Sequence, residues 1–343
     1  MQGKQRIKKR DYNLEIVRIF SFFSVIAIHV TNYFCRAYDE ISAGEYGFSL
    51  ALNTVARVSV PCFFMITGAL LLGREETLEK HVKRLMRFVI VLVVWSILYY
   101  IWNTVYMKTP YRLRDILYVP TEPHLWYLYA MIPIYMVLPF LQIMCRFMGM
   151  KLEYAFLVLI SITTVFNYIS SLLHEEAYYD LPLVGDKVYM FYVFIGYYIY
   201  RYRKHIQISQ KAALLLFVGN MAAVYGITVW VTVNAGEHYE RILEYGCPFL
   251  VAGSAAFFLW MIRFRRCHFE PAEKSKKRIE KICSCSFGIY LVHILFLDTY
   301  KKYIEPADLT AWAAVPLLIC GIAAVSYVCI FLLRKCAWGR KIT

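Results

Sequence analysis

The sequence predicts an all-α integral membrane protein that crosses the bilayer about ten times. Hydrophobic residues make up 60% of the chain and aromatic residues 17%, and the mean hydropathy is +0.49. These values lie above those of soluble domains. About ten apolar runs are long enough to cross roughly 30 Å of hydrocarbon as helices. No segment between them is long enough to fold alone, so we expect a single membrane domain over residues 1–343.

The predicted spans follow one another with short loops between them. Their approximate limits are Asn13–Cys35, Phe48–Leu72, Leu85–Met107, His124–Met148, Leu152–Leu172, Lys187–Tyr200, Ala212–Val233, Ile242–Ile262, Ile282–Leu297 and Ala311–Leu333. The sixth is short and rich in tyrosine. Residues 1–12 form a basic segment before the first span, and residues 334–343 form a tail after the last.

The charge distribution predicts the orientation of the chain. It has 38 Lys and Arg against 24 Asp and Glu, a formal net charge of +14. With the N-terminus in the cytoplasm, about 28 basic residues fall in inside segments and about 8 in outside loops. We therefore expect both termini in the cytoplasm and contact with anionic membrane lipids. The charge needs no nucleic-acid partner to explain it.

The first span contains the densest set of polar residues. Arg18 and His29 are eleven residues apart. On a helix they share one face, about 16 Å apart along the axis. Glu15 is placed to pair with Arg18. Ionisable residues inside a span are costly and by default functional, although Arg18 could simply reach the inner headgroups and His29 could be a hydrogen-bonded core residue.

The second span contains a buried arginine, and two more lie at the cytoplasmic mouth of the third. Arg57 precedes Pro61 by one turn. It can bind a substrate oxygen or satisfy carbonyl groups that the proline leaves free, and both interpretations stay open. Arg84 and Arg87 form the motif RLMR at the start of the third span. Such a pair can clamp an anion from one helix face, or it can be an ordinary positive-inside cluster.

Two later spans contain histidines. At the start of the fourth, Glu122 and His124 lie at the predicted outer surface with Trp126 and Tyr127 behind them, a placement typical of an interfacial aromatic belt. In the ninth, His293 lies near mid-membrane beside Tyr290, and its role is either structural or catalytic.

Together these motifs resemble the acyltransferase-3 family of membrane O-acyltransferases. The resemblance rests on the following segments, which extend over essentially all the predicted spans: LEIVRIFSFFSVIAIH, VPCFFMITGALL, RLMR, HLWYL and SFGIYLVH. Standalone enzymes that modify surface polysaccharides and the membrane domain of vancomycin-resistance serine racemases are similar in this way. Glu15 stands where the family usually has aspartate, and Thr67 where it usually has serine.

The resemblance implies an enzyme of a bacterial plasma membrane. It would move an acyl group, most simply acetyl, from cytoplasmic acyl-CoA to a hydroxyl of an extracytoplasmic glycan or a small acceptor. Acetyl-CoA is then the donor. The ten cysteines lack the paired spacing of a zinc site, so no metal is expected. A homo-oligomer is compatible with the apolar surface.

The resemblance also implies roles for individual residues. His29 would act as general base or as transient acyl carrier, assisted by Glu15 and Arg18. The coenzyme phosphates would be bound by Arg84, Arg87 and Arg18. The acceptor would contact Arg57, His124, Trp126 and His293. The alternative function is a transporter for a small polar substrate such as an amino acid, in which the same residues would be substrate or proton sites.

Overall fold

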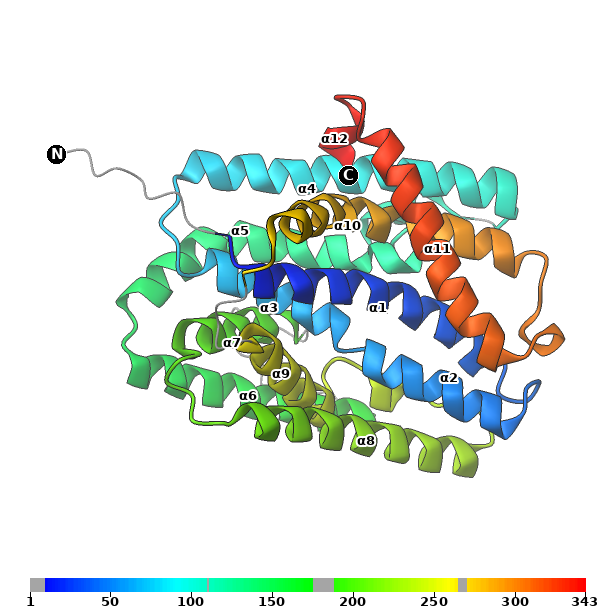
Figure 1. The fold of residues 1–343 in the computed structure, drawn as a ribbon, viewed down its shortest axis with the longest axis horizontal. Coiled ribbons are helices and arrows are strands. Elements are labelled where there is room, and N and C mark those ends of the chain that lie inside the picture. The colour runs from blue at the N-terminus through cyan, green and yellow to red at the C-terminus, as the bar shows by residue number, and fades with distance from the viewer. Residues whose placement is uncertain (1–9, 110, 175–187, 265–269) are drawn as a thin grey trace.

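The computed structural model describes residues 10–109, 111–174, 188–264 and 270–343. In this part of the chain all regular elements are helices, as predicted (Figure 1). Nine helical segments of it are long and apolar enough to cross a membrane. Residues 1–9 of the predicted basic segment and Lys187 of the sixth predicted span lie outside the described residues.

The helices agree closely with the predicted spans. Their bounds are α1 (Tyr12–Arg36), α2 (Ala43–Ala56), α3 (Ser59–Leu71), α4 (Leu78–Ile101), the π-helix η1 (Trp102–Met107), η2 (Leu113–Leu117), η3 (Pro123–Leu125), α5 (Trp126–Phe147), α6 (Met150–Leu172), α7 (Tyr189–Tyr202), α8 (Gln210–Ala235), η4 (Arg241–Leu243), α9 (Pro248–Ile262), α10 (Glu273–Lys301), η6 (Pro306–Asp308), α11 (Ala311–Leu333) and α12 (Gly339–Ile342). Helix α7 has 14 residues and corresponds to the short sixth span.

Helices α1, α3 and α10 form the centre of the bundle. The apolar windows of α1, of the α2–α3 segment and of α10 are 61%, 67% and 67% buried, against 22% for each of α4, α6 and α8. The outer helices expose large apolar side chains such as Ile90, Phe166 and Leu215. In a membrane these faces contact lipid, which makes the burial of polar side chains in the central helices the more informative feature.

The second predicted span is broken into two helices at Arg57. Pro61 has no N–H to donate to the Arg57 carbonyl, and its ring crowds that carbonyl, so a continuous helix is disfavoured there. Asn53 fixes the break, because its Nδ2 donates to the Ile28 carbonyl at 3.2 Å and to Thr31 Oγ1 at 2.9 Å on α1. Arg57 therefore lies in the turn between the two helices, one helical turn after Asn53.

Helices α3 and α7 cross with their backbones in direct contact. A Cβ atom on Gly68 would lie 1.8 Å from the Val193 carbonyl oxygen, and one on Gly196 would lie 2.2 Å from the Met65 carbonyl oxygen. Small residues at such crossings allow membrane helices to pack closely. This contact fixes α3, which supplies residues to both cavities described below.

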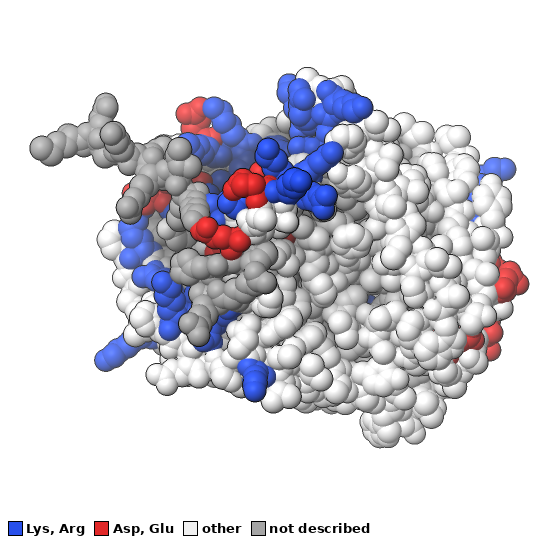
Figure 2. Space-filling model, viewed as in Figure 1, with Lys and Arg blue, Asp and Glu red and all other residues white. Residues whose placement is uncertain are grey.

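Charged residues gather at one end of the bundle. Figure 2 shows Lys and Arg over the end where α1 and α10 begin. The last helix, α12, returns to pack against α4, where Trp95 Nε1 donates to the Ile342 carbonyl at 2.9 Å. Arg334 donates to the Thr343 carbonyl at 3.0 Å, so the predicted tail is tied to this basic end.

Candidate active site

Three histidines from three elements meet inside the bundle. His29 comes from α1, His124 from η3 and His293 from α10. Their ring centroids are separated by 5.2 Å (His29 and His293), 5.4 Å (His124 and His293) and 6.4 Å (His29 and His124). His124 is 1% exposed and His293 is fully buried, whereas His29 is partly exposed to a cavity. The prediction that His124 lies in a belt at the outer surface is therefore wrong, because the turn before α5 directs its ring into the bundle.

The histidine cluster has unused hydrogen-bonding capacity. His293 Nδ1 lies 2.7 Å from the Tyr290 carbonyl oxygen and must donate to it, so Nε2 is the nitrogen with the free lone pair. Within the described residues, His293 Nε2 and both ring nitrogens of His124 have no partner. Buried polar atoms are nearly always bonded, so unpartnered ones beside a cavity indicate a place for a ligand or water.

An outer cavity of ≈ 670 Å³ borders this cluster. Its apolar wall consists of side chains from α1 and α3, namely Val25, Ile28, Val60 and Phe63. Its polar wall contains Asn32, Arg57 and Glu240, and the rings of Trp126 and Tyr245 close it, with centroids 5.8 Å apart. Three of the predicted substrate-binding residues, Arg57, His124 and Trp126, thus line one cavity together with His29, and His293 lies behind them.

Arg57 and Glu240 supply the charges of the outer cavity. Arg57 Nε donates to Asn53 Oδ1 at 3.0 Å, and its Cζ lies 6.0 Å from the Tyr245 ring centroid. Glu240 pairs with Arg36 at 2.9 Å. Burial raises the pKa of Glu240, but the hydrogen bond and charge of Arg36, together with Arg57, outweigh it and hold the pKa below its ordinary value. The carboxylate is thus ionised at neutral pH.

An inner cavity of ≈ 870 Å³ has arginines in an otherwise largely apolar and aromatic lining. Arg18, Arg74 and Arg84 line it. Glu15 holds Arg18 at 2.8 Å, and Glu76 holds Arg84 at 2.8 Å. Among the described residues, Arg74 Nε and Arg84 Nη1 have no hydrogen-bond partner. Unused guanidinium N–H groups around a cavity are suited to binding a phosphate or carboxylate.

The structure separates the two arginines of the RLMR motif. Arg84 faces the inner cavity, whereas Arg87 is exposed and its Nη2 donates to the Thr343 carbonyl at 3.2 Å. Residues three apart on a helix differ by about 60° in direction, which is enough to point one toward α5 and the other toward α12. The third arginine that lines the inner cavity is instead Arg74, which lies in the loop after α3.

The two cavities share one wall. Phe63 from α3, Tyr127 from α5 and Tyr290 from α10 line both of them. We call these three side chains the aromatic partition. Arg18 lies on the inner side of it and His29 on the outer side, so the stripe predicted on α1 runs past the partition from one cavity to the other.

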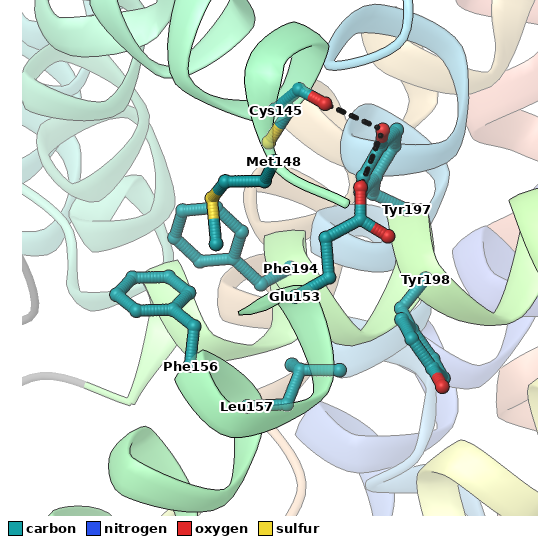
Figure 3. A pocket seen from close by; sticks show the side chains of 8 residues that line it. All are labelled: Cys145, Met148, Glu153, Phe156, Leu157, Phe194, Tyr197 and Tyr198. Atoms are coloured by element: carbon teal, nitrogen blue, oxygen red, sulfur yellow. Dashed lines mark hydrogen bonds between the residues drawn. The ribbon is translucent and has the colours of Figure 1, made fainter. Parts of the chain in front are cut away.

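A third, smaller cavity lies between α5, α6 and α7, away from this route (Figure 3). Tyr197 donates to Glu153 Oε1 at 3.2 Å, and Arg201 pairs with the same oxygen at 3.0 Å. Figure 3 shows Glu153 and Tyr197 turned toward each other, with Phe156 and Phe194 beside them. Because its charged groups are bonded to each other, this cluster joins α6 and α7.

Sequence reasoning missed several residues of the two cavities. Asn32 follows His29 by three residues on α1, so helical spacing could have identified it. Arg74, Glu240 and Tyr245 lie in loops. Nothing in the local pattern distinguishes them from other loop residues, and only the fold brings them to the cavities.

A partly buried carboxyl group lies at the outer end of the bundle, two residues before His124. Glu122 Oε2 accepts from Asn103 Nδ2 at 3.1 Å. Burial, with the charge of Asp298 adding to it, raises the pKa of Glu122 to about 7. This group therefore changes its charge near neutral pH.

Comparison with known proteins identifies the family of the chain. The acyltransferase domain family matches residues 11–334. An amino-acid racemase from Enterococcus faecalis is 24% identical over 334 residues, which is 87% of this chain and 43% of the racemase. The chain thus spans less than half the length of that relative. No solved structure matches it. Because the family match covers nearly the whole chain, the protein belongs to the acyltransferase-3 family, and its long apolar helices are those of a multi-pass membrane protein.

Proposed function

We propose that the protein transfers an acyl group, in the simplest case acetyl, from cytoplasmic acyl-CoA to a hydroxyl of an extracytoplasmic cell-surface glycan or related acceptor. The observation that supports this most is the pair of cavities that share the aromatic partition, one lined by arginines and the other bordered by imidazoles. The basic end of the bundle faces the cytoplasm of a bacterial cell in this proposal, as the positive-inside rule requires.

The inner cavity binds the donor. Arg18, Arg74 and Arg84 hold the phosphates of the coenzyme through charge-assisted hydrogen bonds. Glu15 and Glu76 keep two of these guanidinium groups in position. The pantetheine arm then extends along α1, whose two functional residues are roughly 16 Å apart, and brings the thioester to His29.

His29 performs the chemistry in the outer cavity. As general base, its imidazole takes the proton of the acceptor hydroxyl while the oxygen attacks the thioester carbon; the carbon–sulfur bond breaks, and the thiolate recovers the proton as the coenzyme thiol. As acyl carrier, the imidazole nitrogen attacks the same carbon first, the carbon–sulfur bond breaks, and the thiolate takes the ring N–H proton to become the coenzyme thiol. The acceptor oxygen then attacks the acyl carbon, and the imidazole leaves and takes up the hydroxyl proton. Both routes place the thioester carbon beside His29. They differ in whether acyl-labelled protein forms.

The polar wall of the outer cavity binds the acceptor. Trp126 and Tyr245 offer aromatic faces, and Asn32, Arg57 and Glu240 offer hydrogen-bonding groups for hydroxyls. A mostly apolar pocket with a few converging polar groups is typical of a small-molecule site. A sugar ring, with its apolar face and polar rim, matches this lining.

Inverted membrane vesicles that contain the protein test the proposal. Acetyl-CoA labelled in the acetyl group is added outside, on the cytoplasmic face, and labelled acetate or acetylated acceptor is measured inside. We expect label to enter the lumen while the coenzyme stays outside. His29→Ala should abolish this transfer, and His205→Ala, at an exposed position, should not. Entry of intact substrate without thiol release would support the transporter alternative and contradict the proposal.

A further inference from the structure

The aromatic partition is the narrow part of the path between the two cavities. The Phe63 and Tyr127 ring centroids are 6.0 Å apart, and those of Tyr127 and Tyr290 are 5.6 Å apart. Each ring comes from a different helix, and each borders both cavities. A chain that extends directly from the inner to the outer cavity therefore passes these rings.

The rings are held in place by their neighbours. The Tyr290 hydroxyl donates to the His124 carbonyl, which also links the partition to the histidine cluster. Tyr127 packs against Phe64, with ring centroids 5.1 Å apart. Thr67 Oγ1 donates to the Phe63 carbonyl at 3.0 Å and so uses its hydroxyl within α3. The three rings belong to three separate helices, which limits how far they can move apart. A pantetheine arm that carries an acyl group therefore fits only in the space between the edges of the rings.

The outer cavity beyond the partition has aliphatic side chains in its lining. Val25 and Ile28 of α1 and Val60 of α3 line it next to His29. These side chains are 3%, 6% and 8% exposed, so they have little freedom to move aside. When the thioester carbon lies beside His29, the acyl chain must fit between these aliphatic side chains and the partition.

We propose that the aromatic partition determines the length of the acyl group that the protein transfers, with Phe63 and Tyr127 as the residues that set the limit. The proposal rests on the proposed function, since it assigns the acyl specificity of the same site. A rigid apolar wall discriminates against one extra methylene by about 10-fold to 200-fold. Short, unbranched acyl groups are then the substrates, and removing a ring from the wall admits longer ones.

The test compares acetyl-CoA, butyryl-CoA and hexanoyl-CoA as donors for purified protein, with thiol release as the signal. We expect Phe63→Ala and Tyr127→Ala to raise the ratio of kcat/KM for butyryl-CoA to that for acetyl-CoA by at least about 10-fold. Phe63→Leu and Tyr127→Leu remove the ring but keep a large side chain, and they serve if the alanine variants do not fold. Tyr290 is left unchanged because its hydroxyl bonds to the histidine segment.

Phe156 provides the matched control. It is a partly buried phenyl ring at the third cavity, outside the path (Figure 3). Phe156→Ala should keep the acyl-length ratio of the parent protein. If the parent protein releases thiol from acetyl-CoA but the Phe63 and Tyr127 variants keep its ratio, the role of the partition is wrong. If the parent protein releases thiol from none of the three donors, the proposed function itself fails.

Discussion

The inner and outer cavities are built from the same central helices but differ in their chemistry. The inner cavity has three guanidinium groups, two of which are held by buried or partly buried glutamates. The outer cavity is bordered by imidazole nitrogens that have no hydrogen-bond partner among the described residues, and aliphatic side chains line it together with His29. The first is suited to strong binding of an anion, and the second to proton transfer in a largely apolar space.

This difference separates binding from chemistry in space. Binding energy gained from a remote, non-reacting part of a substrate can be used to position the reacting part. Here the arginines would hold the coenzyme while the reaction takes place roughly 16 Å farther along α1. Substitutions in the two cavities should therefore affect different kinetic constants.

The largest expected effect is that of His29→Ala. Loss of a general base or nucleophile lowers turnover by about 100-fold to 10000-fold. Binding of acetyl-CoA, measured by calorimetry on the purified variant, should stay within about twofold of the parent protein because the inner cavity is unchanged. Substantial remaining turnover would remove His29 from the mechanism. Acyl-labelled parent protein, trapped by acid quench, would identify His29 as carrier.

A smaller effect is expected for the arginines. Arg74→Ala and Arg84→Ala should each raise the KM for acetyl-CoA by about 10-fold with little change in kcat, as expected for a lost hydrogen bond to a charged group. Arg87→Ala removes the same charge from an exposed position on α4 and should raise the KM less. Equal effects of Arg84→Ala and Arg87→Ala would mean that general surface charge, and not the inner cavity, attracts the donor.

The acceptor side can be tested through Glu240. Glu240→Gln keeps the shape of the side chain but removes its charge, so acceptor binding should weaken by about 3-fold to 10-fold. Acyl transfer to the envelope glycan is measured in cells, and thiol release from acetyl-CoA without acceptor is measured on the purified variant. We expect the first to fall and the second to persist. If acyl transfer and thiol release fell together, Glu240 would be needed for folding and not for acceptor binding.

Much of the fold could be predicted because membrane helices are long, apolar and continuous. The nine long segments and the short α7 correspond to the ten predicted runs. The break between α2 and α3 is different. It depends on Pro61 and on the bonds from Asn53 to α1, and only the proline is visible as a local signal.

The site was less predictable than the fold because it depends on contacts between distant segments. That Arg18 and His29 lie on one face of α1 follows from helical spacing alone. The meeting of His124 and His293 with His29 does not, since the three lie on separate elements. The direction of Arg87 depends on α12, and the place of Arg74 on the loop after α3, so the RLMR motif indicated a basic mouth without identifying its inward-facing members.

The smallest expected effect is on the pH dependence of the melting temperature. We expect it at the outer end of the bundle and not at the inner cavity, because arginines do not titrate in the neutral range. The pKa of Glu122 rises from an ordinary value of 4.5 to about 7, since burial and Asp298 disfavour its charged form. The unfolded chain therefore loses this proton first, and the folded protein loses stability as pH rises from about 4.5 to 7.

Glu122→Gln stays neutral throughout. It should be as stable as the parent protein at pH 4.5 but melt roughly 2 °C higher at pH 8. Glu237→Gln, at an exposed position after α8, is the control for loss of a surface carboxylate. If both variants show the parent protein's pH dependence of melting, Glu122 is not held in its neutral form, and the outer end is no more sensitive to pH than the arginine-lined inner cavity.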